Sequence, residues 1–268
     1  MSLNGTKTIF IVLVVSGAVL ISGCGGTKLL KDPLPHTQVE PLAQSSDPHL
    51  QVSLDWIIVR DGPGSWAKNV DWDEYLIRVE NRVDHPVRLQ FVTVVDSLGT
   101  RIVPGLDRKQ LVRASKRAVR RYEGHGLQVK AGLGAGTLAS AGVASGATAA
   151  ALLASGPLAL SSSAATAAAG GVVLLPVLTV GGIVRGMNNG RVNDQILARQ
   201  TRLPLELAGN QTANLAVFFP LTPSPREIEI GYIDACGSHA LRIDTRVPLD
   251  SLHLGPNATA VDGASGAP

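Results

Sequence analysis

Residues 75–91 read YLIRVENRVDHPVRLQF, and the fold class follows from their pattern. Apolar residues occupy every second position on both sides of a polar cluster that runs from Asn81 to Pro86. This alternation turns one face of each segment toward a core and the other toward solvent, which is typical of antiparallel β-strands. The sequence therefore predicts a β-hairpin here, within a protein built mainly from half-buried strands.

The same period of two occurs on both sides of this segment. It begins near Leu50 and returns after residue 200. The alternating apolar positions outside residues 75–91 are Val52, Leu54, Trp56, Leu203, Leu205, Leu207, Leu215, Val217, Phe219, Ile228, Ile230, Tyr232, Leu241, Ile243 and Val247. About four short strands in each half, separated by turns, favour an antiparallel β-sandwich of immunoglobulin-like type. This resemblance concerns architecture alone and implies no activity.

Each half needs the other, because its apolar face and strand edges require a cover. We therefore predict one sandwich whose halves are residues 50–105 and 201–254, interrupted by an insertion at residues 106–200. The bulky residues expected in its core are Trp56, Trp66, Trp72 and Tyr75. The acids expected to form a solvated turn are Asp71, Asp73 and Glu74.

The insertion opens with a predicted amphipathic helix that is capped by Asp107 and stopped by Gly124. An apolar stripe on it contains Leu111, Val119 and Tyr122. The cations that share its other face at helical spacing are Lys109, Arg113, Lys116, Arg117 and Arg120. Residues 101–130 hold nine basic and two acidic residues, a local net charge of +7 in a chain whose total is +3.

This basic face is expected to contact a membrane surface or another anion. Anionic lipid headgroups fit better than nucleic acid, because no aromatic residues for base stacking alternate with the cations. The alternative is a solvated helix face without a partner.

An uncharged segment of 54 residues, 131–184, follows the basic helix. Its composition of small residues and its glycine spacing predict a helical hairpin, with arms at 131–154 and 164–184. The glycines that the spacing assigns to helix packing are Gly132, Gly136, Gly142, Gly146, Gly182, Gly186 and Gly190. The segment resembles the glycine-zipper segments of some envelope lipoproteins.

Three interpretations of this Gly/Ala-rich hairpin stay open. It inserts in a bilayer, it packs against copies of itself or a partner, or it is a flexible loop. Each arm has about the 20 residues that span a hydrocarbon core. Ala and Gly drive insertion weakly, and basic flanks normally stay in the cytoplasm. The absence of charge argues against a solvated loop.

The first 24 residues have the pattern of an export signal. Lys7 precedes an apolar run from Ile9 to Ile21, and small residues then lead to Cys24. A run of this length suits a signal peptide and is too short for a spanning helix. The sequence Ile21-Ser-Gly-Cys24 resembles the lipobox of bacterial lipoproteins. The resemblance implies that residues 1–23 are removed and that the thiol of Cys24 is lipidated. An uncleaved signal anchor is the alternative.

The residues after Cys24 bear on location. In the lipoproteins that this signal resembles, retention at the inner membrane usually needs Asp in the next position, where this chain has Gly25. The resemblance therefore implies the outer membrane, with the body facing the periplasm. Residues 24–49 are rich in proline and lack a period, so we expect a lipidated tether. Residues 255–268 are expected to form a disordered tail.

Signals for catalysis, metals and cofactors are weak. The histidines are His36, His49, His85, His125, His239 and His253, and no two have the spacing of a ligand pair. Cys236 and His239 lie three apart, but one such pair does not make a zinc site. We expect no catalytic residue, metal or cofactor, and we expect Cys236 to be a small buried residue.

The sequence as a whole predicts a non-enzymatic envelope lipoprotein with a structural or interaction role. Its expected partners are membrane lipid, through acylated Cys24, and either copies of itself or an envelope protein, with no nucleic acid. Its insertion is expected to engage a membrane or to self-associate. The alternative function is a subunit of an oligomeric outer-membrane pore or of a secretion or assembly complex.

Overall fold

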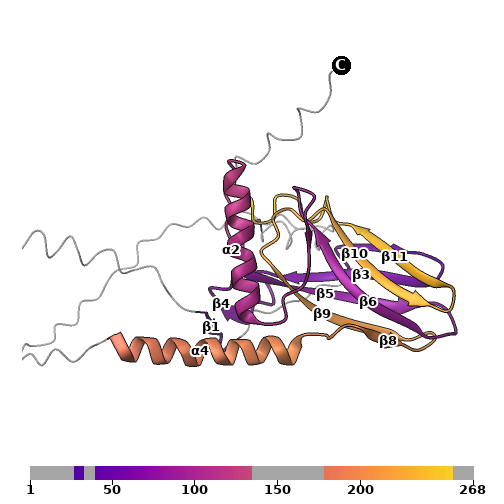
Figure 1. Cartoon of the computed structure of the whole chain (residues 1–268), viewed down its shortest axis with the longest axis horizontal. Helices are drawn as coiled ribbons and strands as arrows, with labels where there is room; N and C mark the ends of the chain where they lie inside the picture. Colours follow the sequence, from indigo (N-terminus) through magenta and orange to yellow (C-terminus); the bar gives the residue numbers. More distant parts are fainter. Residues whose placement is uncertain (1–26, 33–39, 135–177, 256–268) are drawn as a thin grey trace, which may run out of the picture.

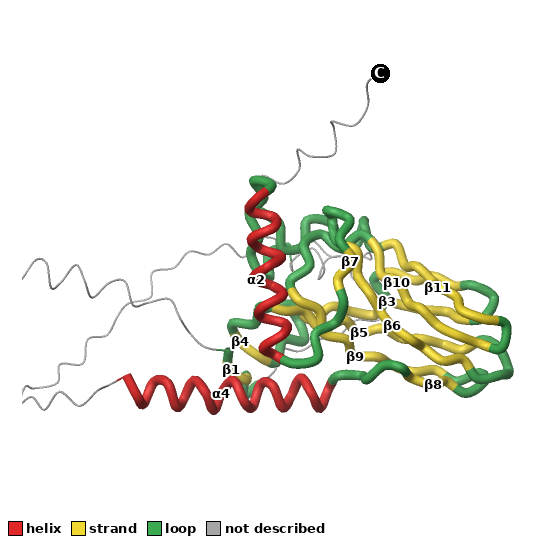
Figure 2. Tube along the Cα trace, viewed as in Figure 1, coloured by secondary structure: helices red, strands yellow, loops and turns green. Residues whose placement is uncertain are grey.

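A computed structural model of the chain describes residues 27–32, 40–134 and 178–255. This part is mainly β, and its antiparallel strands form two large sheets packed as layers, and one small sheet, with two helices at one end (Figures 1 and 2). The mainly β prediction, and the sandwich arrangement it implies, are confirmed at this level.

The first sheet has the order β2-β3-β5-β9. Its strands are β2 (Ala43–Ser46), β3 (Leu50–Ile58), β5 (Trp72–Asn81) and β9 (Thr212–Pro220). The first half of the chain therefore pairs directly with the second, with Ile77 opposite Leu215. A two-stranded sheet, β1 (Lys28–Leu29) with β4 (Ala67–Lys68), lies beside it.

The second sheet has the order β11-β10-β6-β7, and β8 also pairs with β6. Its strands are β6 (Val87–Val95), β7 (Arg101–Ile102), β8 (Leu205–Leu207), β10 (Glu227–Asp234) and β11 (Gly237–Asp244). Alternate residues of both sheets meet in one hydrophobic core. The aromatic residues predicted for the core, Trp56, Trp66, Trp72 and Tyr75, are all buried there.

The hairpin predicted for residues 75–91 is wrong, because β5 and β6 belong to different sheets. The connection between them is an arch built around Asn81. The side-chain amide of Asn81 donates to the carbonyls of His85 (2.9 Å), Leu207 (3.3 Å) and Ala208 (2.9 Å). Alternation in the sequence marks a strand, but it does not say which neighbour the strand pairs with.

The immunoglobulin-like strand order is not confirmed. In an immunoglobulin sheet, strand B pairs with strand A and with strand E, and not with the strand that follows it in the chain. Here β3 pairs with β2, which precedes it, and with β5, which is the next long strand along the chain.

The sandwich has two different ends. One end, which we call the helical end, carries α2 (Arg108–Gly124) and α4 (Leu178–Arg199) (Figure 1). The other, the distal end, carries the β2–β3 turn and the β10–β11 turn. The long strands between them rise by about 3.4 Å per residue, so the two ends lie about 30 Å apart.

The basic helix forms as predicted. Asp107 caps α2, and its side chain accepts a hydrogen bond from the backbone N–H of Gln110 (2.8 Å). The residues that α2 buries are Leu111, Ser115, Ala118 and Tyr122. Ser115 fastens the helix to the sheet, because its hydroxyl accepts from the N–H of Leu221 at 3.0 Å and donates to the carbonyl of Asp71. The hydroxyl of Tyr122 meets Ser97 at 2.8 Å, and burial raises its pKa to about 12.

The predicted second arm of the hairpin, 164–184, differs from α4. The helix runs 15 residues beyond position 184, to Arg199, because the buried side chains of Val192 and Ile196 dock this more polar part of it onto the core. Most of the predicted hairpin, residues 135–177, lies outside the described residues. In the part of the chain that the structure describes, no helix is both long and apolar enough to cross a membrane.

The glycines assigned to helix packing have different surroundings. Gly132 lies in a turn with φ +78°, not in a helix, and a Cβ there would come within 2.5 Å of the Arg60 carbonyl oxygen. Gly186 and Gly190 lie on α4, where a Cβ would meet no atom within 4 Å. Gly182 lies in the same helix. Gly136, Gly142 and Gly146 lie outside the described residues.

Part of the predicted tether, residues 24–49, is folded onto the sandwich. Residues 28–29 form β1, and residues 43–46 form β2 at the edge of the first sheet. The sequence of β2, Ala-Gln-Ser-Ser, has no alternating apolar residues. It needs none, because backbone pairing to β3 holds this strand. At the other terminus, the N–H of Gly255 donates to the Gln128 carbonyl, and residues 256–268 lie outside the described part.

Candidate functional site

The five predicted cations form one exposed face of α2. They are Lys109, Arg113, Lys116, Arg117 and Arg120, and they lie opposite the residues that the helix buries. None of the five forms an ion pair with any residue that the structure describes. Two other cations of α2 do have partners: Arg121 pairs with Asp96, and Arg108 contacts the hydroxyl of Thr27 at 3.3 Å. We call the five the basic face.

A hollow of about 400 Å³ adjoins the basic face. Lys116 and Arg120 of the basic face line it together with Arg60 and Lys130. Asp71 and Glu123 are its acidic lining residues, and Asp71 is already paired with Arg60 at 3.1 Å. Four cations against two carboxylates make the hollow electropositive, which suits an anionic group.

The start of the uncharged segment and the C-terminal end of α4 are both held at the helical end. Where the segment begins, the N–H of Lys130 donates to the His253 carbonyl (2.9 Å), and the N–H of His253 donates to the Leu133 carbonyl (2.8 Å). Past its end, Arg199 closes α4 against Glu74 of β5. The first described residue, Thr27, also lies at this end, where its hydroxyl meets the Asn69 carbonyl at 3.5 Å.

His253 is held by a buried carboxylate. The N–H of Gly132 donates to His253 Nδ1 at 3.2 Å, so the ring proton lies on Nε2 and is donated to Asp73 Oδ2 at 2.8 Å. Both side chains are fully buried. Burial and the charge of Asp73 together raise the pKa of the nearby Tyr75 hydroxyl well above its usual value.

Glu74 holds α4 as Asp73 holds His253, through an ion pair with Arg199 at the end of the helix. Its carboxylate accepts from Arg199 Nε (2.9 Å) and from the indole N–H of Trp66 (2.7 Å). The Arg199 guanidinium also lies over the Trp66 ring, 5.4 Å from its centroid. The prediction that Asp71, Asp73 and Glu74 form a solvated turn is therefore wrong, because all three are paired and the last two are buried.

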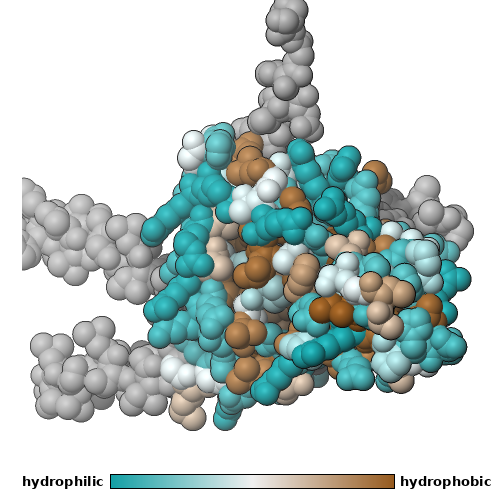
Figure 3. Space-filling view, turned by 45° about the vertical axis from the view of Figure 1, so that its right-hand side comes forward, coloured by the Kyte–Doolittle hydropathy of each residue, from teal (hydrophilic) through white to brown (hydrophobic). Residues whose placement is uncertain are grey.

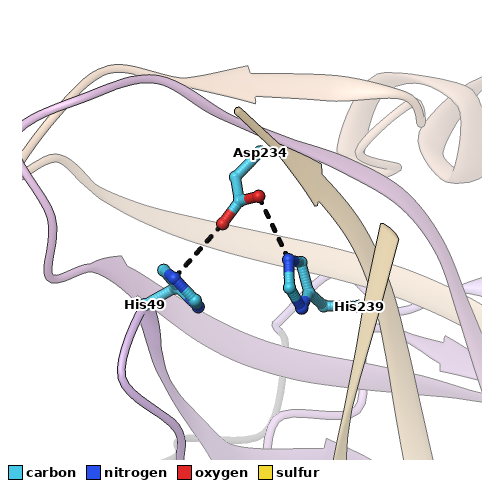
Figure 4. Close-up of side chains that lie close together, drawn as sticks. All are labelled: His49, Asp234 and His239. Carbon is cyan, nitrogen blue, oxygen red and sulfur yellow. Dashed lines mark hydrogen bonds and ion pairs between the residues drawn. The ribbon is translucent and has the colours of Figure 1, made fainter. Parts of the chain in front are cut away.

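The distal end carries a cluster that sequence reasoning missed (Figure 4). The carboxylate of Asp234 lies between two imidazoles, 3.3 Å from His49 Nε2 and 3.1 Å from His239 Nε2. His49 is 185 residues from Asp234 in the chain, so no local spacing could reveal the contact. Cys236, in the adjacent turn, is exposed and not buried as predicted, because it is one of two loop residues between β10 and β11.

An apolar hollow of about 440 Å³ lies between the loop that precedes α2 and the C-terminal end of α4. Phe91, Leu106 and Leu197 contribute exposed side chains to it. Figure 3 shows several hydrophobic patches among hydrophilic neighbours on the face that it presents.

Comparison of the chain with family profiles, with curated proteins and with solved structures finds no match.

Proposed function

We propose that the chain is an envelope lipoprotein with a structural or interaction role rather than an enzymatic one. In this proposal Cys24 is lipidated in the outer membrane and the body faces the periplasm. The observation that carries the proposal is the basic face of α2, which lies at the same end as Thr27, the start of the uncharged segment and the anchored C-terminal end of α4.

The basic face orients the body on an anionic surface. Each Lys or Arg near an anionic membrane contributes about 1 kcal/mol of attraction. The five cations lie on one side of a helix whose opposite side is fixed to the sheet, so they can face a membrane together. The helical end then rests on the headgroups, and the distal end extends about 30 Å away from them.

The uncharged segment acts next to that surface in this proposal. The segment begins at the helical end, where backbone hydrogen bonds to His253 hold it, and α4, the helix that contains its last residues, is anchored at the same end through Arg199. The segment is proposed to engage the bilayer or to pack against copies of itself.

Substitution of two cations is expected to weaken binding to anionic vesicles. The test compares the full chain with and without Arg113→Gln/Arg117→Gln, in a Cys24→Ala background that removes the lipid. Two lost charges correspond to about 2 kcal/mol, a roughly 30-fold weaker partition into phosphatidylglycerol vesicles. Co-sedimentation with vesicles measures it, and added salt should weaken the parent chain as well.

The matched control changes two exposed arginines away from α2, Arg82→Gln/Arg88→Gln. It removes the same charge and should leave partition nearly unchanged. Equal losses in both variants would mean that net charge alone drives binding. Equal partition of the parent chain into anionic and zwitterionic vesicles would contradict the proposal.

A second candidate function is a subunit of an oligomeric pore or of a secretion or assembly complex. The exposed apolar hollow around Phe91, Leu106 and Leu197 favours it. Light scattering of the full chain in detergent should then give the mass of several chains, and Leu106→Glu should reduce it. The mass of one chain would contradict this candidate.

A further inference from the structure

We propose that His49, Asp234 and His239 at the distal end bind a divalent transition-metal ion of the zinc class. The site lies at the opposite end from the basic face and does not depend on the function proposed above.

The ligand atoms already have the spacing of a metal site. One nitrogen or oxygen from each residue lies within 4.8 Å of the others. Zinc holds such ligands about 2.0–2.1 Å away in a tetrahedron, which separates them from one another by about 3.3 Å. The observed distances are of this order, 3.3 Å from His49 Nε2 to Asp234 Oδ2 and 3.1 Å from His239 Nε2 to Asp234 Oδ1, the other oxygen of the carboxylate.

The hydrogen-bond roles around His49 leave a lone pair facing a carboxylate. Tyr232 donates its hydroxyl proton to Asp47 Oδ2 at 2.7 Å, so toward His49 Nδ1, 3.3 Å away, it can only accept. A neutral His49 then carries its proton on Nδ1, and its bare Nε2 points at Asp234.

A lone pair and a carboxylate oxygen repel each other unless a cation lies between them. Asp234 Oδ2, the oxygen that faces His49, has no hydrogen-bond partner, and its side chain has no surface accessible to solvent. A metal ion there satisfies both atoms. The chain from Asp47 through Tyr232 to His49 is then the outer shell that fixes the orientation of a ligating histidine.

The backbone fixes the carboxylate in place. The N–H groups of Cys236 (2.7 Å) and Gly237 (3.0 Å) both donate to Asp234 Oδ1, which leaves Oδ2 toward His49. Two imidazoles with one carboxylate suit zinc, copper, nickel or iron, whereas magnesium and calcium prefer oxygen ligands alone.

Rigid elements position all three ligands. Tyr232 and His239 are directly opposite each other on β10 and β11, and their rings stack at 5.1 Å. His49 lies in the β2–β3 turn, where Asp47 Oδ1 accepts from the N–H of His49 and of Leu50, at 2.8 Å each. Three protein ligands leave a fourth position for water. The ion would tie the edge of one sheet to the other.

The test is calorimetric titration of the full chain with Zn²⁺ after metal has been removed with a chelator. A Cys236→Ser, Cys24→Ala background excludes binding by thiols. One Zn²⁺ should bind per chain, Mg²⁺ should not compete, and affinity should fall on acidification because imidazole must lose its proton to ligate. His49→Ala and His239→Ala should each weaken binding at least tenfold.

The matched control is His85→Ala, which removes another histidine paired with an aspartate, Asp84, at 3.3 Å. It should bind Zn²⁺ like the parent chain. Thermal unfolding without metal checks that each variant folds, and Zn²⁺ should raise the midpoint of the parent and of the control but not of the two ligand variants. Absence of binding in the parent, or undiminished binding in both ligand variants, would overturn the proposal.

Discussion

Substitution of His253 by alanine is expected to lower the free energy of unfolding by about 3–5 kcal/mol, the range for a buried charge that loses its partner. His253 and Asp73 are both fully buried, and the imidazole donates to the carboxylate at 2.8 Å. The second oxygen of Asp73 has no hydrogen bond to compensate. The variant leaves this carboxylate without its hydrogen bond from the ring.

Urea unfolding of His253→Ala, followed by circular dichroism, measures the loss. The control is His125→Ala, an exposed histidine at the end of α2, which should change stability little. Asp73→Asn combined with His253→Ala should recover part of the loss, because no charge is then buried. A loss below about 1 kcal/mol for His253→Ala, as for exposed pairs, would contradict a charged Asp73 at this position.

Substitution of Arg199 by alanine is expected to cost about 3 kcal/mol, the lower part of the range for broken buried pairs. We expect the lower value because the Arg199 side chain is 38% exposed, so water can replace part of the lost ion pair at Glu74, although the Glu74 side chain itself is only 2% exposed. Glu74 keeps only the hydrogen bond from Trp66. The C-terminal turn of α4 should therefore loosen.

A double variant separates charge from packing. Glu74→Gln in combination with Arg199→Ala removes the buried charge and still accepts the indole N–H, so it should be more stable than Arg199→Ala alone. Arg202→Ala, an exposed arginine three residues later, is the control. If the double variant loses as much stability as the sum of its single variants, the two side chains are not coupled.

The two contacts have a common structural consequence. Asp73 and Glu74 are neighbours on β5, so their side chains point to opposite faces of the sheet. Asp73 holds the segment where the uncharged insertion begins, and Glu74 holds the helix that follows it. The strand β5 therefore anchors both the start of the uncharged segment and the C-terminal end of α4.

Local patterns predicted the elements well. The alternation in residues 50–91 and 201–247 marked most long strands, because burial on one face of a sheet repeats every two residues. Asp107 and Gly124 marked the limits of α2, because capping is chemistry within a few residues of the chain. The edge strand β2 was missed, since it is held by backbone pairing and needs no apolar residues.

Pairings between distant residues were not predictable in this way. Asn81 lies where the chain crosses from one sheet to the other, and its hydrogen bonds to the carbonyls of Leu207 and Ala208, more than 120 residues away, hold this crossing in place. The acids of β5 look solvated in the sequence, but partners from the C-terminal half bury them. His49 joins Asp234 and His239 only because the two sheets place their turns together.

The sequence by itself determined the mainly β class, the basic amphipathic helix and the uncharged insertion, because periodicity, capping and charge are properties of neighbouring residues. Only the tertiary structure decided which strands pair, how the insertion is held and where the imidazoles meet the carboxylate. Several of those features, such as the pairing of β5 with β9 and the contact of His49 with Asp234, depend on residues more than 100 positions apart. The free energy of such contacts exists only once the sheets have packed.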